Sequence, residues 1–532
     1  MGATRQVIIV GGGPVGVGLA IDLAQRGVSC TLVERRVGMH NIPKGQNLTQ
    51  RTLEHFYFWG CVEEVRAQRL LPPEVPSAGI VAYRSLTNEH WHSFEGREIV
   101  APYYFQKNDR LPQYCFENVL RKRMAKLPLI EARFGWAAQT IAQDEHGVCV
   151  GVVHEAGGGA RETLEADYVI GCDGAHSVVR EQAGIRREGT DFDQPMVLAV
   201  FHSREFSEGL GKRFPVHSTY RVMEPALNGY WQFFGRVDAQ EGFFFHSPVP
   251  VNTTRDNYDF AALLHRVAGF EFPCRFEYVG FWDLRVAVAE KYRAGRVFIA
   301  GDAAHSHPPY GGFGVNNGLE DAANLAWKLA GRLNGWAGEA LLTSYDLERR
   351  PVFKQVGEEF ITARIKWEGE VINRHDPKQN PTAFAQAWAE LKTGAGPIVA
   401  NFEPNYEGSP IVFGPSGGVT GARGEYMFKA RAGHHLAPRI LTSGRNVFQE
   451  LGGSFVLLAL DAPVETVAKF ESAALARKVP LRVIRDTLAD GRQDYEARFV
   501  LVRPDQYVAW VGDAEPADAD AIICRAAGLD AA

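Results

Sequence analysis

A chain of 532 residues exceeds the usual size of one domain, about 150 residues, so it predicts two to four domains or one large enzyme with an appendage. Hydrophobic residues make up 45% and charged residues 23%, and the net charge of −6 comes without a basic block, which argues against nucleic acid and anionic membranes as partners. No apolar run approaches the roughly 20 residues that a membrane span needs, so a small molecule is the expected partner.

The beginning of the chain and its cysteines indicate a reducing compartment. Met1 leads almost directly into an apolar run, without the basic, apolar and small-residue regions of a signal peptide, so we expect a cytoplasmic protein. The seven cysteines show no CxxC pair and no histidine cluster at ligand spacing, so we expect neither disulfides nor a metal site. The sequence leaves the oligomeric state open, with a homodimer as one option.

The first forty residues predict a βαβ unit: a strand over 7–10, a glycine-rich turn over 11–16, a helix to residue 25 and a second strand from residue 30. Gly11, Gly13 and Gly16 have GxGxxG spacing between the strand and the helix. The first glycine permits the tight turn, the second permits close approach of a pyrophosphate, and the third permits close helix packing. This arrangement predicts a dinucleotide site.

Glu34 ends the second predicted strand, about twenty residues after the turn, where a carboxylate can accept hydrogen bonds from a ribose. An acid at this place disfavours a 2′-phosphate. The GxGxxG spacing also occurs in ordinary glycine-rich turns, but the strand before it and Glu34 after it favour a dinucleotide. They do not distinguish FAD from NAD.

The rest of the chain changes pattern several times. Alternating, aromatic-rich segments after about residue 198 predict a mostly antiparallel sheet that could wall an apolar pocket, and a Pro-, Gly- and Asn-rich stretch reads as a connection. We therefore predict the following parts: 1–185, a first part of a cofactor domain with some substrate-domain strands near 72–105; 186–285, the sheet domain; 286–375, the second part with long helices; 376–424, the connecting segment; and 425–532, a small α/β domain.

Two further motifs bear on the choice between FAD and NAD. The run Val297 to His305 with Pro308 to Ala322 resembles the second FAD motif of the FAD-dependent aromatic hydroxylases, the class A flavoprotein monooxygenases. The run Asp167 to Arg180 resembles the Asp-Gly motif that this family links to FAD and NAD(P)H. All three motifs occur in the family's order. The resemblance implies an α/β fold with a Rossmann-like FAD-binding domain and an antiparallel-sheet substrate domain.

Smaller matches extend the resemblance to the whole chain. Lys44 stands where the family usually carries an arginine near the FAD pyrophosphate, and it keeps the charge but loses the bidentate fork. Gln113 matches a family glutamine on FAD. The run Phe499 to Trp510 resembles the thioredoxin-like C-terminal domain of the phenol hydroxylase branch, which without a CxxC pair is expected to have no redox role.

The motifs and the resemblance together assign a set of FAD-binding residues. Glycines and peptide N–H groups at a helix start would stabilise the anionic reduced flavin. The set comprises Gly11, Gly13, Pro14, Gly16, Glu34, Arg35, Lys44, Gln113, Asp173, Gly301, Asp302, Pro309, Gly312, Gly314, Val315 and Asn316.

The activity that the resemblance implies is hydroxylation of an aromatic, by preference phenolic, substrate with O2 and NADH or NADPH through a C4a-hydroperoxyflavin. The same oxygen donor could serve a Baeyer–Villiger reaction on a polyketide or displace a nitro or halo group from a substituted phenol. A flavin-dependent halogenase is disfavoured because its Trp-x-Trp-x-Ile-Pro signature is missing. A flavin-bound protein without turnover is the alternative from another class.

The sequence is least informative about the reacting end. The phenol hydroxylase branch has an acid where this chain shows Gln46-Asn47, and glutamine cannot act as a base. The candidate catalytic residues are therefore His246 and Tyr220, or no base at all, with Pro308 beside the flavin ring. The residues predicted to line the substrate pocket are Gln46, Trp231, Phe233 and Tyr310.

Overall fold

The structure, a computed structural model, describes residues 6–94, 96–394 and 396–530. The predicted βαβ unit is confirmed: β1 (Val7–Val10) pairs in parallel with β2 (Cys30–Glu34), and α1 (Pro14–Gln25) connects them. The sheet runs in the order β17 (Arg293–Ala294), β18 (Val297–Ile299), β11 (Tyr168–Gly171), β1 (Val7–Val10), β2 (Cys30–Glu34) and β7 (Ile130–Phe134). Its central strands are apolar throughout because both faces of a parallel sheet are covered.

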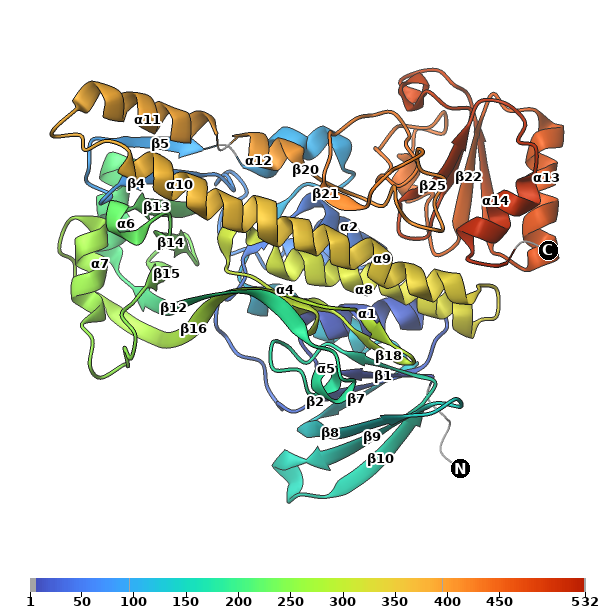
Figure 1. Ribbon diagram of the computed structural model, residues 1–532, viewed down its shortest axis with the longest axis horizontal. Coiled ribbons are helices and arrows are strands. Elements are labelled where there is room, and N and C mark those ends of the chain that lie inside the picture. The colour runs from blue at the N-terminus through green and yellow to red at the C-terminus, as the bar shows by residue number, and fades with distance from the viewer. Residues whose placement is uncertain (1–5, 95, 395, 531–532) are drawn as a thin grey trace.

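A small antiparallel sheet extends from this first body, at the bottom of Figure 1. It contains β8 (Trp136–Gln143), β9 (Val148–His154) and β10 (Arg161–Ala166). Four helices complete the N-terminal part of the chain: α2 (Gln50–Phe58), α3 (Val62–Arg66), α4 (Gln113–Met124) and α5 (Val178–Gln182). The short strands β3 (Asn47–Leu48) and β6 (Asp109–Arg110) pair beside them.

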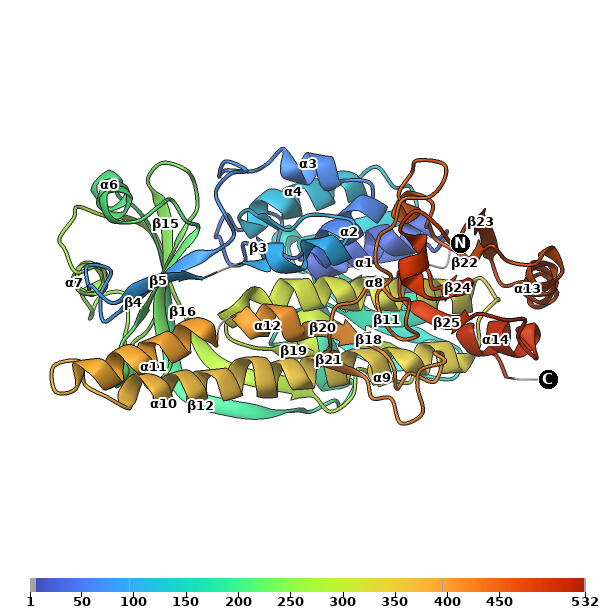
Figure 2. The same ribbon diagram turned by 90° about the horizontal axis from the view of Figure 1, so that it is seen from above.

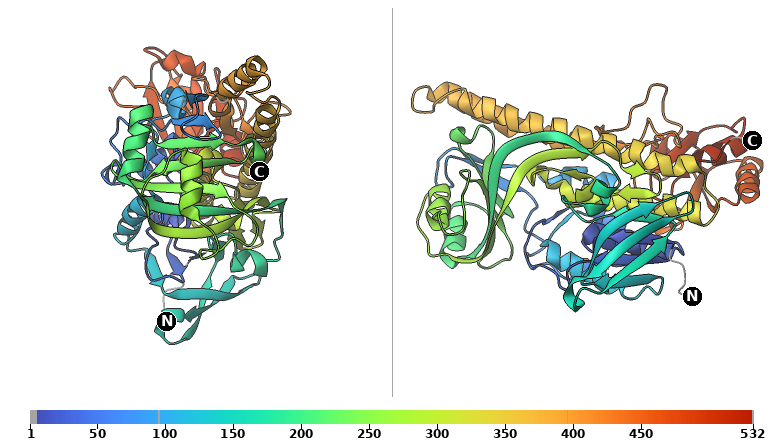
Figure 3. Two further views of the ribbon diagram at one scale, coloured as in Figure 1. Left: turned by 90° about the vertical axis from the view of Figure 1, so that its left-hand side faces the viewer. Right: turned by 60° about the horizontal axis from the view of Figure 1, so that its bottom comes forward.

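The predicted aromatic sheet is confirmed. It has eight strands among the described residues, and their pairing is antiparallel except between β13 (Thr219–Met223) and β4 (Gly79–Tyr83), which run parallel. Its order is β19 (His305–Ser306), β16 (Arg275–Ala289), β12 (Arg187–His202), β15 (Gly242–Pro248), β14 (Trp231–Arg236), β13 (Thr219–Met223), β4 (Gly79–Tyr83) and β5 (Trp91–Phe94). The long strands β12 and β16 curve together from the first body into this second one (Figure 3).

Alternation along these strands gives the sheet two apolar faces. Tyr220, Phe234 and Phe245 pack with α6 (Arg204–Arg213) and α7 (Phe260–Ala268) on one face. Trp231, Phe233 and Phe244 lie on the other face, with the long helices. Since successive side chains of a strand point to opposite faces, the aromatic run of β14 supplies both an outer core and an inner wall.

Two helical rods run along the molecule (Figure 2). Helix α8 (Gly314–Leu333) turns back into α9 (Glu339–Gln355), which continues through a π-helical segment (Val356–Thr362) into α10 (Ala363–Asn373). The predicted long helices are thereby confirmed. None of the helices within the described ranges has both the length and the apolar composition that crossing a membrane requires.

The segment predicted to be a connection contains regular structure. It forms α11 (Pro381–Thr393), α12 (Gly396–Asn401) and the strand pair β20 (Phe402–Asn405) and β21 (Gly421–Arg423). The residues that suggested a loop start a helix instead, because the Asn380 side chain accepts a hydrogen bond from the N–H of Ala383 and Pro381 occupies the first turn. The buried side chains of Phe384 and Trp388 hold α11 against the sheet.

The C-terminal part is a four-stranded sheet with a helix pair, as the thioredoxin-like resemblance predicted. The strands run in the order β23 (Leu481–Asp486), β22 (Phe455–Leu460), β24 (Phe499–Val502) and β25 (Val508–Gly512), with α13 (Val464–Arg477) and α14 (Ala519–Ala526). Strand β22 pairs in parallel with β23 and antiparallel with β24.

A buried ion network joins this sheet to the helical rods. Glu348 of α9 accepts hydrogen bonds from Arg503 at 2.7 and 2.8 Å and from Lys328 of α8 at 2.6 Å, and all three side chains are fully buried. Burial opposes ionisation of Glu348, but the charges of Arg503 and Lys328 prevail and hold the pKa of its carboxyl well below its usual range. Each of these charges is therefore tolerated only because the others are present.

We predict that Glu348→Gln lowers the free energy of unfolding by about 3–5 kcal/mol, because it leaves the buried Lys328 without a counter-charge and leaves Arg503 with Asp505 alone. Chemical denaturation measures this loss. The matched control is Glu358→Gln, at an exposed pair with Lys354, which is expected to cost less than about 1 kcal/mol. Because the folded-state pKa of Glu348 is lowered, its contribution is complete above the ordinary glutamate pKa of about 4.3 and disappears as pH falls below it. Equal losses in the two variants would contradict the prediction.

Candidate functional site

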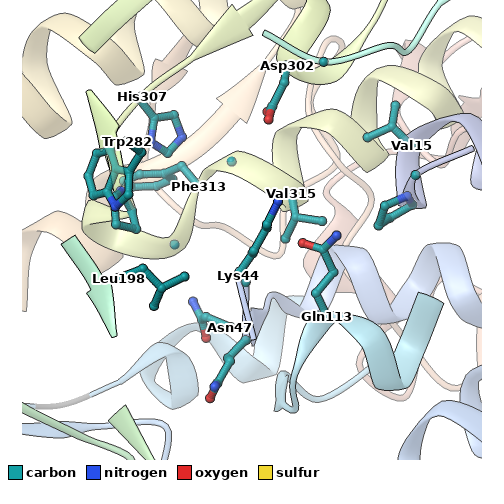
Figure 4. Close-up of a pocket in the computed structure, with 18 of the residues that line it drawn as sticks. Val15, Lys44, Asn47, Gln113, Leu198, Trp282, Asp302, His307, Phe313 and Val315 are labelled. Carbon is teal, nitrogen blue, oxygen red and sulfur yellow. The ribbon is translucent and has the colours of Figure 1, made fainter. Parts of the chain in front are cut away.

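One large cavity, about 1090 Å³, lies between the first body and the eight-stranded sheet. The glycine-rich turn after β1 and the start of α8 form one end, and the inner face of the aromatic sheet forms the other. Figure 4 shows side chains from these separate elements converging on the same space. The cavity has room for a dinucleotide together with a small aromatic molecule.

The turn between β1 and α1 leaves open space on its cavity side. A Cβ on Gly16 would lie 2.0 Å from the carbonyl oxygen of Gly11, so only glycine permits this helix to start so close to the strand. A Cβ on Gly13 would meet no protein atom within 4 Å, although this residue lines the cavity. The turn is thus closed toward the protein and open toward the cavity, as a pyrophosphate requires.

The carboxylate of Glu34 organises this end. One oxygen accepts a hydrogen bond from the N–H of Gly12 at 2.6 Å, and the other accepts one from the N–H of Arg36 at 2.8 Å. The structure therefore places Glu34 at the turn, and ribose binding by this residue stays a prediction.

Asp302, Lys44 and Gln113 extend into the middle of the cavity from three different elements (Figure 4). The side chain of Asp302 is open to the cavity interior but enclosed by protein, and this burial raises the pKa of its carboxyl, while nearby cations including Lys44 oppose the shift. Asp173 lies on the same side, where its carboxylate accepts from the Ser177 hydroxyl at 2.5 Å. These groups form a polar middle section between the phosphate end and the aromatic end.

The start of α8 is held open by two left-handed glycines, Gly311 with φ 74° and Gly312 with φ 67°. The side chain of Asn316 braces this loop, because its amide oxygen accepts from the Thr49 N–H at 2.9 Å and its amide nitrogen donates to the Gly312 carbonyl at 2.6 Å. The free N–H groups of the first turn then face the cavity with the positive end of the helix dipole.

The structure brings most of the predicted cofactor residues together. Those that line the cavity are Gly11, Gly13, Pro14, Glu34, Arg35, Lys44, Gln113, Asp173, Asp302, Pro309, Gly312, Gly314 and Val315. Gly16, Gly301 and Asn316 stand behind this layer, where they permit or brace the close approach of its members. Direct binding by these three is therefore not expected.

The aromatic end contains Trp231, Phe233 and Tyr310, and Gln46, the fourth residue predicted to line a substrate pocket, also lines the cavity. The rings of Trp231 and Tyr310 stack at 4.0 Å, and the guanidinium of Arg221 lies 3.7 Å from the centre of the Trp231 ring. Such flat walls suit a planar aromatic molecule.

His246 lines this end and stacks on Phe233. Its Nδ1 lies 3.3 Å from the indole nitrogen of Trp282, which can only donate, so Nδ1 is the acceptor and the neutral ring carries its proton on Nε2. Burial lowers the pKa of His246 to about 3. The residue is therefore a weak base, and its geometry suits a hydrogen-bond donor instead.

Two candidates for catalysis do not reach the cavity. Tyr220 faces the outer core, where its hydroxyl accepts from the N–H of His217, because its place in β13 directs it to the opposite face of the sheet. Pro308 is buried behind the wall, where its carbonyl accepts from His307, and the next residue, Pro309, lines the cavity. The suggestion of Tyr220 as a base and of Pro308 beside the reacting ring is corrected accordingly.

Several lining residues are not among the predicted ones. They are Arg97, Arg110, Arg221, Trp282, His307, Arg364 and Glu368. Two of them have a local signal, because Arg110 precedes Gln113 by three residues and His307 lies between the two halves of the motif from Val297 to Ala322. The others come from segments without a motif and reach the cavity only through the fold.

Comparison with known proteins agrees with this geometry. A family profile described as FAD binding domain matches residues 4–359, and one described as aromatic-ring hydroxylase, C-terminal, matches residues 429–530. The chain is 30% identical to 4-methyl-5-nitrocatechol 5-monooxygenase of Burkholderia sp, over 98% of this chain and 97% of that protein. It is 29% identical to tetracenomycin B2 monooxygenase-dioxygenase of Streptomyces olivaceus, over 97% of each.

The fold is also similar to that of a solved flavoprotein structure. The ternary complex of aklavinone-11 hydroxylase with FAD and aklavinone has a TM-score of 0.80 at 25% identity, over 99% of this chain and 100% of that one. The open turn at Gly13, the carboxyl of Asp302 in the cavity and the helix start at Gly314 fit an FAD.

We predict that Gly13→Ala folds normally but binds FAD at least about tenfold more weakly, because the new Cβ meets no protein atom yet occupies the space that a diphosphate needs. The backbone at residue 13 has φ −75°, which alanine adopts without strain. Flavin absorbance of the purified protein and FAD titration of the apoprotein measure the effect. Gly38→Ala, another open glycine outside the turn, serves as the control. Full retention of FAD by Gly13→Ala would place the diphosphate elsewhere.

Proposed function

This chain belongs to the FAD-binding aromatic-ring hydroxylases, a family of flavin-dependent monooxygenases, and on that premise we propose that it hydroxylates a phenolic substrate with O2 and NADH or NADPH. The observation that carries the proposal is a single cavity that joins a dinucleotide-binding turn to a chamber walled by aromatic rings. FAD, when bound, accepts electrons from the nicotinamide and activates O2.

The residues at the first end hold the cofactor in register. The turn at Gly13 would receive the diphosphate, with Lys44 as its counter-charge, and Asp302 and Gln113 would hold the polyol chain. The N-terminus of α8 lines the same cavity, where its dipole would favour negative charge on the reduced flavin. Because these groups come from elements braced by buried hydrogen bonds, they need not reorganise during the reaction.

The aromatic end orients the substrate and keeps water away. The rings of Phe233 and Phe244 and the edge of Trp231 would border a planar phenol, and this aromatic lining would limit the competing loss of activated oxygen to water.

His246 contributes a proton at a defined atom. With Nδ1 engaged by Trp282, its Nε2–H is available as a donor to an oxygen of the substrate. This bond fixes the ring position in the chamber and stabilises negative charge on that oxygen. The proposal assigns His246 to orientation and not to proton abstraction.

The activity itself is tested with the purified yellow protein. We expect that phenols accelerate aerobic oxidation of NADH or NADPH and that the product gains one oxygen atom, which mass spectrometry with ¹⁸O2 identifies as coming from O2. A product formed from ketones but not phenols would instead support Baeyer–Villiger chemistry. Bound FAD without any substrate-stimulated oxidation of NADH or NADPH would support the alternative that the protein binds flavin without turnover.

We predict that His246→Phe lowers kcat/KM about 10- to 100-fold by removing the donor, without changing the shape of the pH profile between pH 5 and 9. His246 is neutral over this whole range, because burial lowers its pKa to about 3, so it cannot produce an inflection there. Trp282→Phe, which releases the ring tautomer, is expected to lose a smaller part of the rate. An inflection near pH 6–7 in the parent that disappears in His246→Phe would show that the residue acts as a base.

A further inference from the structure

The charges at the aromatic end of the cavity do not balance. Among the described residues that line the cavity beyond the diphosphate turn and the polar middle section, the charged side chains are Arg97, Arg110, Arg221, Arg364 and Glu368. Their formal charges add to +3. An enclosed apolar chamber for a neutral phenol gains nothing from such an excess, because each unpaired cation loses hydration without a partner.

One part of this charge is compensated within the protein. Glu368 lies between two arginines, at 2.5 Å from the Nε of Arg364 and 3.3 Å from a terminal nitrogen of Arg221. Arg221 also covers the ring of Trp231. These contacts explain how two arginines are held at the wall with a single carboxylate.

Arg97 and Arg110 have no carboxylate partner among the described residues. No described carboxylate forms an ion pair or hydrogen bond with either guanidinium. Arg97 is only 7% exposed and contacts the ring faces of Phe313 at 5.8 Å and Phe402 at 5.2 Å. The Nε of Arg110 is buried without a hydrogen bond, and burial alone lowers the pKa of its guanidinium to about 10.

Both arginines line the cavity where its two ends meet. Arg97 contacts the rings of Phe313 and Phe402, which pack with the aromatic sheet, and so lies toward the substrate side. Arg110 pairs in register with Asn47, which lies against the loop at Gly312 beside the start of α8. The diphosphate end has its own cations, Lys44 and the arginines after Glu34.

We propose that the aromatic substrate is an acid, and that Arg97 and Arg110 supply the counter-charge for its carboxylate. The inference rests on the proposed function for the fate of the ring, and it narrows the substrate class from phenols in general to phenolic acids. A carboxylate between two guanidiniums accepts strong charge-assisted hydrogen bonds, and the cations regain the interactions that burial removed.

Binding of matched ligand pairs tests the proposal. The probes are one- and two-ring phenolic acids, such as 4-hydroxybenzoate and 3-hydroxy-2-naphthoate, each compared with its methyl ester, which has the same ring without the charge. Dissociation constants come from the change that each ligand causes in the flavin spectrum of the holoenzyme. We expect at least one acid to bind at least about tenfold more tightly than its ester, and the ratio to fall as salt rises.

Variants of the two arginines test whether these residues bind the carboxylate of the acid. Arg110→Gln and Arg97→Gln are expected to weaken binding of the acid about tenfold or more and to leave binding of the ester unchanged, while Arg110→Lys restores part of the preference. Arg161→Gln, at an exposed position in β10, is the control and keeps the full ratio. Flavin absorbance is recorded for each variant.

The outcomes separate this inference from the proposed function. If no acid binds more tightly than its ester, or if the variants lose FAD or lose acid and ester equally, the inference is overturned, and oxygenation of neutral phenols would leave the proposed function standing. If acids bind preferentially and the arginine variants abolish this preference, the inference holds even when no probe is oxygenated, in which case the proposed function fails alone.

Discussion

The arrangement of the whole molecule depends on how buried charges hold helix α8. Asp321 is fully buried and accepts from Arg349 of α9 at 2.8 Å, from His305 at 2.6 Å and from the N–H of Gly301 at 3.0 Å. Burial opposes ionisation of this carboxyl, but His305 and Arg349 lower its pKa. One carboxylate thus fixes the helix, the second rod and the loop that presents Asp302. Since removal of any partner leaves a buried charge, these three elements hold a single arrangement.

The parts of the fold that sequence reasoning reached are those with local rules. The glycine spacing at Gly11 to Gly16 dictates a strand, a turn and a helix within ten residues, and the alternating aromatic segments that include β14 indicate a mostly antiparallel sheet. The segment after Asn380 was misjudged for a related reason, because Asn and Pro occur both in loops and in the first turn of a helix. What decides between them is the apolar surface that Phe384 and Trp388 find in the fold.

The reacting end lay beyond sequence reasoning because its partners are far apart in the chain. Arg221 and Glu368 are 147 residues apart in the chain. Trp282 of β16 meets His246 of β15 across strand β12, which lies between them in the sheet. A list of aromatic residues could name Trp231 and Tyr220 with equal reason, but the pleat sends one into the cavity and the other into the outer core. The direction of a side chain follows from register, and register is a property of paired strands.

The network around Glu348 also bears on the order in which the chain is made. Arg503, which together with Lys328 surrounds this carboxylate, follows Glu348 by 155 residues. During synthesis on the ribosome, Lys328 of α8 and Glu348 of α9 therefore emerge before Arg503, which joins them only after the C-terminal sheet has left the exit tunnel. The C-terminal sheet thereby completes the electrostatic environment of α8, the helix whose first turn lines the cavity. The charge balance around this helix is reached only after the C-terminal sheet has folded against the two helices.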